Sequence, residues 1–262
     1  MATTAPTPFD IRLMNFTATL VFVLFALTLV GAGAWWVLRQ PFFPIAALKV
    51  DGEVTHNSAV TLRANVAPQL TGNFFTVDLA RARAAFESVP WVRQAVVRRE
   101  FPNKLRATLT EHVPVAHWGE EAGSRLVNGY GEIFEANVGE VDDHKLPRLD
   151  GPPEQAGQVL GMYRMLVPLF APYEIGIEEL GLSSRGSWHV LLDTGAMIEL
   201  GRGRSEEVAA RTERFLRTVA QVAAQYGRTV ASIEGADLRH HEGYALRMRG
   251  VTTVASEPPK KK

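Results

Sequence analysis

LMNFTATLVFVLFALTLVGAGAWWVL, residues 13–38, contains no charged side chain and lies between Arg12 and Arg39. A helix rises about 1.5 Å per residue, so about 20 residues cross a hydrocarbon core about 30 Å thick. Trp35 and Trp36 stand at the C-terminal end, where indole rings favour the headgroup layer. The stretch predicts a single transmembrane helix, with all that follows Arg39 on one side of a membrane.

Two other interpretations of this stretch remain open. The triplet Ala32-Gly33-Ala34 is similar to the cleavage site of a secretory signal, although the apolar run is longer than a usual signal core. A core helix of a soluble protein is the other alternative. The charges do not decide the orientation, because Arg39 and Lys49 flank the far end of the stretch.

The composition describes an ordinary folded protein outside the membrane. The formal net charge is zero, which gives no large basic field for nucleic acid. The chain has no cysteine, which excludes disulfides and thiolate metal sites. Residues 1–12 form a short tail, and residues 251–262 end in a polar, lysine-rich segment that we expect to be disordered.

Residues 42–113 have the pattern of a first small domain. In residues 104–111, Leu105, Ala107 and Leu109 alternate with polar residues, which predicts a strand with one buried face. Asp78 is a favourable N-cap for a helix. The order is β-α-α-β-β, a three-stranded sheet with two helices on one face. The expected elements are a strand at 45–50, helices at 60–66 and 79–88, and strands at 92–99 and 104–111.

Residues 114–250 form a second predicted domain with a mainly antiparallel sheet and two helices, so the fold class is α+β. Helices are expected at 156–170 and 206–226; in the second, Val208, Arg211, Phe215 and Val219 mark one side. The expected strands are 116–118, 126–127, 133–134, 146–149, 175–182, 188–192, 197–200, 230–238 and 244–248.

No pattern of catalytic or metal-binding residues stands out. Gly201-Arg202-Gly203 precedes a helix, but two glycines without a Lys-Ser/Thr pair are weak evidence for a phosphate loop. His240 and His241 are adjacent, and adjacent residues on a strand point to opposite faces. We therefore expect no catalytic residue, metal or cofactor. The remaining candidate histidines, His117, His144 and His189, are scattered in the sequence.

The first domain and its junction resemble the FtsQ/DivIB family of cell division proteins. The similarity lies in residues 90–99, PWVRQAVVRR, then Pro102, residues 105–111, and Val113-Pro114-Val115-Ala116. The resemblance implies a POTRA domain followed by a β domain. It further implies a single-pass (type II) inner-membrane protein of the divisome, with a cytoplasmic N-terminus, both domains in the periplasm, and a place at the division septum.

The C-terminal residues 237–248 resemble the family ending, where the partner FtsB, with FtsL, docks by adding a strand. Arg202 matches a family position that pairs with an acidic residue of FtsB. His240 replaces a usual Tyr and Met248 a common Trp, which removes aromatic anchor area. Packing of Tyr244, Leu246 and Met248 into the core is the competing interpretation. The expected partner-binding residues are Arg202, Arg239, His240, Gly243, Tyr244, Leu246 and Met248.

Two hypotheses follow for the function. The favoured one is a non-enzymatic scaffold that links early and late division proteins, with FtsB, FtsL and possibly further divisome proteins as partners. Val97 and Arg99 are candidates for a second contact surface on the POTRA domain. The alternative is a periplasmic enzyme or cell-wall-binding protein with a site near Arg202 and the histidines.

Overall fold

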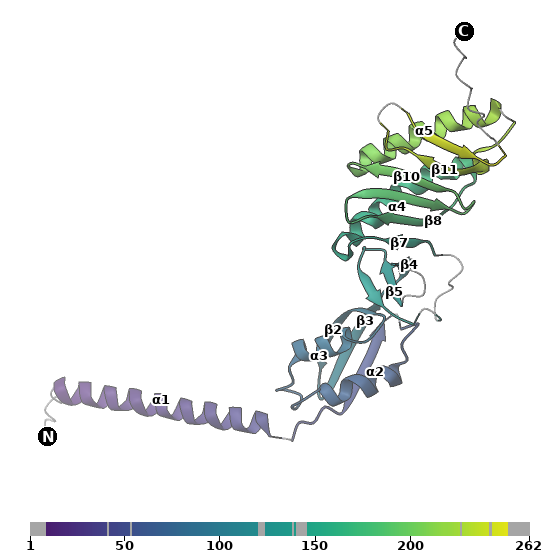
Figure 1. Ribbon diagram of the computed structural model, residues 1–262. Helices are drawn as coiled ribbons and strands as arrows, with labels where there is room; N and C mark the ends of the chain where they lie inside the picture. Colours follow the sequence, from purple (N-terminus) through teal and green to yellow (C-terminus); the bar gives the residue numbers. More distant parts are fainter. Residues whose placement is uncertain are drawn as a thin grey trace, which may run out of the picture. The chain divides into compact units, whose positions relative to one another are not determined.

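The computed structural model describes residues 9–40, 42–52, 54–119, 124–137, 139, 146–225, 227–240 and 243–250 (Figure 1). The chain divides into two compact units between Glu111 and His112. We call them the first unit and the second unit.

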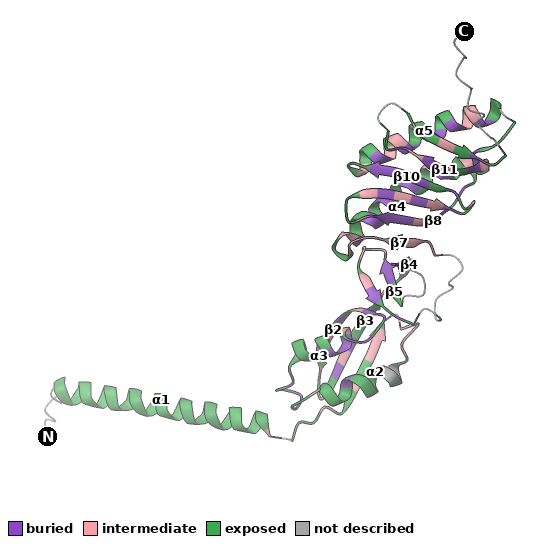
Figure 2. Cartoon of the chain, viewed as in Figure 1, coloured by how far each residue is buried: buried purple, intermediate pink, exposed green. Residues whose placement is uncertain are grey.

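The first unit begins with α1, Phe9–Arg39, a helix of 31 residues with no buried side chain (Figure 2). It is the one described helix that is long and apolar enough to cross a membrane. The hydroxyl groups of Thr17, Thr19 and Thr28 donate to carbonyls three or four residues earlier, which satisfies them inside the helix. The Arg39 guanidinium lies 3.7 Å above the centre of the Trp35 ring.

After α1, the first unit forms a three-stranded sheet in the order β1-β3-β2, which confirms the expected β-α-α-β-β arrangement. β1 is parallel to β3, and β2 is antiparallel to β3. The elements are β1 (Ala47–Gly52), α2 (Ala59–Val66), η1 (Ala67–Gln69), α3 (Leu79–Glu87), β2 (Val92–Glu100) and β3 (Lys104–Glu111).

One core joins both helices of this unit to the sheet. Leu62 and Val66 of α2, Phe86 of α3 and Leu109 of β3 belong to a single buried cluster, so the two helices cover the same face. The side chain of Asp78 accepts hydrogen bonds from two backbone N–H groups of the first turn of α3, as expected for an N-cap.

The second unit contains a nine-stranded mixed sheet in the order β12-β11-β10-β9-β8-β7-β4-β5-β6. Neighbouring strands are antiparallel except for β4 with β7, β7 with β8, and β10 with β11. The strands are β4 (Pro114–Trp118), β5 (Arg125–Asn128), β6 (Ile133–Glu135), β7 (Arg148–Asp150), β8 (Ile177–Leu182), β9 (Ser187–Leu192), β10 (Met197–Arg202), β11 (Ile233–Asp237) and β12 (Ala245–Met248).

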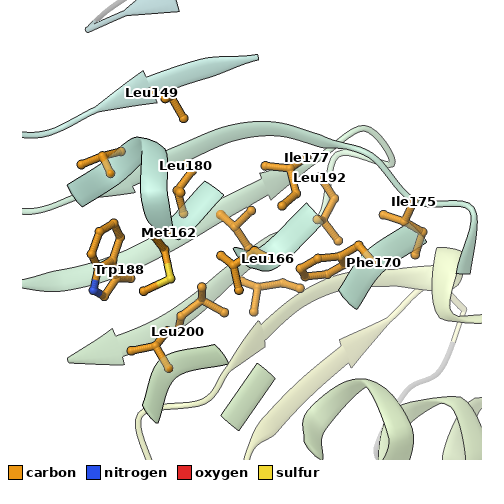
Figure 3. Close-up of a cluster of buried hydrophobic side chains, with 14 of the residues drawn as sticks. Leu149, Met162, Leu166, Phe170, Ile175, Ile177, Leu180, Trp188, Leu192 and Leu200 are labelled. Atoms are coloured by element: carbon orange, nitrogen blue, oxygen red, sulfur yellow. The ribbon is translucent and has the colours of Figure 1, made fainter. Parts of the chain in front are cut away.

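Two long helices, α4 (Ala156–Phe170) and α5 (Ser205–Gln225), close the core of the second unit. Short 3-10 turns η4 (Pro153–Gln155) and η5 (Ala171–Tyr173) flank α4. Met162, Leu166 and Phe170 of α4 point into a cluster with Trp188 and Leu200 of the sheet (Figure 3). The apolar side of α5 joins the same cluster through Val208, Phe215 and Val219.

The expected elements agree with the structure in most positions, with one clear difference. The predicted strand at 230–238 is shorter, because residues 230–232 form the 3-10 turn η6 (Val230–Ser232) before β11. His144, His241 and the tail at 251–262 lie outside the described residues.

Candidate partner-binding edge

β12 is the last strand of the sheet and pairs, among the described residues, with β11 alone. The two strands are antiparallel, with Ala236 opposite Leu246 and Asp237 opposite Ala245. An edge strand carries a row of backbone N–H and C=O groups that another strand can pair with. The open side of β12 is therefore a template for strand addition.

The hydrogen bond after β12 determines which residues face the open side. The Arg249 N–H donates to the Ser232 carbonyl, with 2.9 Å between nitrogen and oxygen. Backbone groups of successive residues in an antiparallel pair point to opposite sides. Arg247, like Arg249, therefore directs its backbone groups toward β11, whereas Leu246 and Met248 direct theirs toward the open edge.

The side chains of β12 point alternately to the two faces of the sheet. Tyr244 and Leu246 are half-buried against the core, and Met248 is buried with 7% exposed. The Tyr244 ring meets the Phe215 ring edge-on, with 4.9 Å between centroids. Of the two interpretations of Met248, its burial agrees with packing of the side chain into the core. Only its backbone faces the edge.

At the end of the sheet where β10 and β11 end and β12 begins lies a hollow of about 430 Å³ lined by arginine and serine side chains. Arg202, at the end of β10, is exposed, and its guanidinium makes no side-chain hydrogen bond or ion pair with another described residue. Arg211 of α5 donates to the carbonyls of Leu200 and Arg202, which fixes its position. The residues lining the hollow are Ser183, Arg185, Ser187, Arg202, Arg211 and Arg239.

Arg239, directly after β11, has a partner of its own. Its guanidinium forms an ion pair with Asp237, with 2.6 Å between Nη2 and Oδ2, and Nε also donates to this carboxylate. The hydrogen bonds from Arg239 outweigh the effect of burial and lower the pKa of Asp237 to about 2. Arg239 therefore faces the hollow already neutralised in part.

A second hollow, a groove of about 600 Å³, runs between α5 and the segment that leads to β12. Phe215, Thr218 and Leu238 form part of its wall, and Gly243 and Tyr244 lie at the strand side. His240 lines it as well and is exposed. Arg211 and Arg239 line both hollows, so the groove and the arginine hollow border the same two side chains.

Comparison with known proteins assigns the chain to a family. The model of the cell division protein FtsQ/DivIB C-terminal region matches residues 116–239, and that of the FtsQ-type POTRA domain matches residues 43–112. The chain belongs to the FtsQ/DivIB family. It thus includes a POTRA domain and a family C-terminal region, and its apolar α1 makes it a membrane-anchored division protein.

Curated relatives match over almost the whole chain. The cell division protein FtsQ of Burkholderia pseudomallei is 41% identical over 254 residues, covering 97% of this chain and 99% of the relative. FtsQ of Thiomonas arsenitoxydans is 40% identical, covering 93% of this chain and 89% of the relative. FtsQ of Bordetella pertussis is 38% identical, covering 91% and 92%. The resemblance found in the motifs is therefore a property of both units.

In the POTRA domain, the two candidate contact residues differ in their surroundings. Val97 is half-buried and packs against the domain core. Arg99 is exposed, but its guanidinium donates to the carbonyls of Phe74, Phe75 and Val77. Arg99 therefore holds the loop before α3 in place, whatever else it contacts.

The structure does not bring the candidate histidines His117, His189 and His240 together. His117 lies on β4 and His189 on β9, and β7 and β8 separate these strands in the sheet. His240 follows β11. Within the described ranges, no group of three or more His, Cys, Asp or Glu side chains is arranged to hold a metal ion.

Two residues near the start of β12 are absent from the partner-binding residues that the sequence predicts. The sequence indicates Arg211 and Phe215 only as part of one side of α5. Arg211 holds the end of β10 through two carbonyls, and Phe215 supports Tyr244. The available signal was a cation within an otherwise apolar helix stripe, which indicates that the stripe borders a polar site.

Proposed function

We propose that the chain is a non-enzymatic scaffold of the bacterial divisome that binds FtsB, together with FtsL, by adding a strand of FtsB to β12. The observation that supports this most is the open side of β12, where Leu246 and Met248 direct their backbone groups. Main-chain hydrogen bonds supply affinity in such strand addition, and alternate side chains supply specificity.

The arginine hollow adds charge to this proposal. Arg202 at the end of β10 and Arg185 in the β8–β9 turn are exposed, and Arg211 of α5 is held by backbone carbonyls at the end of β10. Acidic side chains flanking the added strand would find complementary charge there, which raises the association rate and fixes the register. Arg202 is the expected partner of an acidic residue of FtsB, and His240 and Gly243 border the groove next to it.

The proposed topology follows from α1 and the family. α1 crosses the inner membrane once, with the N-terminus in the cytoplasm and both units in the periplasm at the division septum. The POTRA domain then offers a second contact surface around Val97 and Arg99 for further divisome proteins. In this role the chain needs no cofactor, metal, nucleic acid or small-molecule substrate.

An enzyme or cell-wall-binding protein was the alternative hypothesis. That interpretation needs the histidines and Arg202 to converge on one site. His117 and His189 lie on separate strands of the second unit, and His240 lines the groove but not the arginine hollow that contains Arg202. The open edge strand is the better supported site.

The test is the affinity of the full chain, in detergent micelles, for the periplasmic segments of FtsB and FtsL. Leu246→Pro removes an N–H that faces the open edge and leaves the bonds to β11 intact, so the variant should stay folded. We expect its affinity to fall at least about tenfold, or roughly 1.4 kcal/mol. Tyr244→Ala reports the weight of the side chain that borders the groove.

Arg247→Ala is the matched control, because that side chain lies on the exposed face of the same strand and its backbone pairs with β11. It should bind within about twofold of the unmodified chain. A folded Leu246→Pro variant that binds normally would rule out strand addition at β12. Failure of the unmodified chain to bind would reject FtsB and FtsL as partners and favour the wall-binding or enzyme alternative.

A further inference from the structure

Four phenylalanine side chains that follow α1 in the first unit are exposed although they are large and apolar. Phe42 and Phe101 are 76% and 75% exposed, and Phe43 and Phe75 are each 37% exposed. Contiguous exposed apolar side chains mark contact with another protein or with a membrane. We call Phe42, Phe43, Phe75 and Phe101 the phenylalanine patch.

Ring contacts connect most of this patch through one buried residue. The Phe43 and Phe75 rings meet edge-on, with 5.0 Å between their centroids. Phe74, which is buried, contacts Phe75 on one side and Phe101 on the other, each with 5.2 Å between centroids. Residues from three separate segments of the sequence thus form one aromatic surface on the folded unit.

The sheet topology places this surface at the end of the POTRA domain that the chain enters from α1. β1 is parallel to β3, with Ala47 opposite Lys104, so both strands begin at the same end of the sheet. The Ala46 N–H donates to the Asn103 carbonyl there, with 2.9 Å between nitrogen and oxygen. Phe101 lies in the β2–β3 turn at this same end.

Asn73 joins the loop that carries Phe75 to the end of α1. Its side chain is buried, and Nδ2 donates to the carbonyls of Leu38 and Gln40 at 2.7 and 2.8 Å. Oδ1 accepts from the N–H groups of Phe75 and Thr76. One amide therefore satisfies carbonyls at the C-terminal end of α1, which have no partner inside the helix, and orders the patch loop.

We propose that the phenylalanine patch inserts into the lipid headgroup and acyl boundary of the membrane that α1 spans, on the side of the folded units. Phe42 lies three residues after Arg39, so the chain holds it within about 11 Å of the end of α1. The membrane is thus the one partner that covalent connection guarantees. Apolar rings in interfacial segments lie about 5–10 Å below the headgroup boundary.

The lipid contact would orient the POTRA domain on the membrane surface instead of leaving it on a free tether. Lys104, next to the patch and exposed, suits the negative charge of anionic headgroups. Such an orientation fixes which face of the POTRA domain is open to other proteins. The proposal rests on membrane anchoring by α1 and not on partner binding at β12.

The test uses the cysteine-free chain, which permits single labels, in vesicles of phosphatidylethanolamine and phosphatidylglycerol that contain nitroxide lipids. A polarity-sensitive dye is attached to Phe101→Cys in the patch. Val60→Cys is the matched control, because Val60 is 74% exposed at the start of α2, near the opposite end of the sheet. Gly31→Cys, inside α1, reports insertion of the anchor.

We expect quenching at position 101 to be at least about twofold stronger than at position 60, as interfacial depth requires. Adding Phe42→Ser and Phe75→Ser should reduce it to the level at position 60, with an unchanged circular dichroism spectrum. Equal quenching at 101 and 60, with strong quenching at 31, would overturn the membrane contact and leave the patch to a protein partner. Absent quenching at 31 would overturn the anchoring and the patch contact together.

Discussion

Glu111 and Arg99 of the first unit differ from Arg202 of the second unit in where their hydrogen bonds go. In the first unit, Glu111 is buried, and its carboxylate accepts hydrogen bonds from the N–H groups of Thr55, His56 and Asn57. Arg99 likewise donates to three backbone carbonyls. In the second unit, Arg202 is exposed at the end of β10, and its side chain makes no hydrogen bond with another described residue.

This difference separates residues that maintain the fold from residues available to a partner. A charged group whose hydrogen bonds all go to distant backbone is costly to remove, because its partners stay buried without it. An exposed group without such bonds contributes little to folding and is free to contact another molecule. Glu111 and Arg99 of the POTRA domain are tied to the backbone, as Arg211 is in the second unit, whereas Arg202 stays on the surface.

The strongest test of the contrast is Glu111→Ala. It leaves three backbone N–H groups and the His56 and Asn57 side chains without their acceptor, so the free energy of unfolding of the first unit should fall by about 3–5 kcal/mol. Hydrogen exchange of peptides from β1 to β3 measures this unit separately from the second.

Glu100→Ala is the control for this substitution. Glu100 is paired with Arg106 at 2.8 Å but is 38% exposed, and such surface pairs contribute little to stability. If Glu111→Ala destabilises no more than Glu100→Ala, the carboxylate is not the tie that the geometry indicates.

Arg99→Ala and Arg202→Ala should have opposite effects. The first leaves three carbonyls of the loop before α3 without their donor and should lower the stability of the first unit by about 1–3 kcal/mol. The second should leave the melting temperature unchanged and weaken binding of FtsB by about tenfold through lost charge complementarity. Calorimetry and binding titrations on the same two proteins provide both readouts.

The crossed pattern also tests the second contact surface. A loss of binding to another divisome protein in Arg99→Lys, with stability retained, would show that Arg99 acts in contact as well as in folding. A lower melting temperature of Arg202→Ala would show that the Arg202 guanidinium contributes to the stability of the second unit.

Acidification should affect the first unit through Glu111. Burial raises the pKa of Glu111, but the hydrogen bonds from His56, Thr55 and Asn57 outweigh it, and the pKa is lowered from the ordinary 4.5. The stabilisation is therefore complete above pH 4.5 and is lost as the pH falls through the lower value of the folded state. Glu111→Gln should flatten this part of the stability curve, measured by denaturant unfolding at several pH values.

Asp237 supplies the comparison at the edge. Its pKa is lowered to about 2 by the exposed Arg239, so its effect is lost only as the pH falls below its ordinary 3.8 toward about 2. Asp237→Asn should remove this part of the acid dependence of the second unit, measured by denaturant unfolding at several pH values. A stability curve between pH 3.8 and about 2 that Asp237→Asn leaves unchanged would show that the ion pair with Arg239 does not contribute to folding.

Salt should produce the smallest effect and should again separate the units. Raising the ionic strength from about 0.1 to 1 M shortens the screening length from about 10 to 3 Å. FtsB binding should weaken severalfold as exposed Arg202 and Arg185 are screened, while the buried Glu111 network keeps the stability of the first unit. Equal binding at both salt concentrations would show that the arginine hollow carries no long-range attraction.

Much of the fold was predictable because its signals are local. The alternation of Leu105, Ala107 and Leu109 predicts a strand with one buried face, and all three side chains are buried. Asp78 predicts the start of α3, which begins at the next residue. At the candidate site, the motif placed a strand at the C-terminal end, and β12 is there. These features depend on residues within one turn or one strand.

Other features depended on residues far apart in the sequence. Glu111 lies on the buried face of β3 together with Leu105, Ala107 and Leu109, although it is charged. Its hydrogen-bond partners lie more than fifty residues earlier in the sequence. Met248 was a candidate for partner contact or for the core, and its side chain is buried. Its alternation with exposed Ala245 and Arg247 puts it on one face with Tyr244 and Leu246, but only the fold shows that this face packs on the core.

The sequence by itself determined the membrane helix and the order of elements in both units. An uncharged run of 26 residues forms its backbone hydrogen bonds within a single helix. The hydrophobic periodicity that predicts the other elements is visible within a few residues. Only the tertiary structure decided which polar groups are consumed by the fold and which remain open at β12. Such hydrogen bonds form between chain segments that are distant in sequence, and local sequence patterns do not indicate which distant segments come into contact.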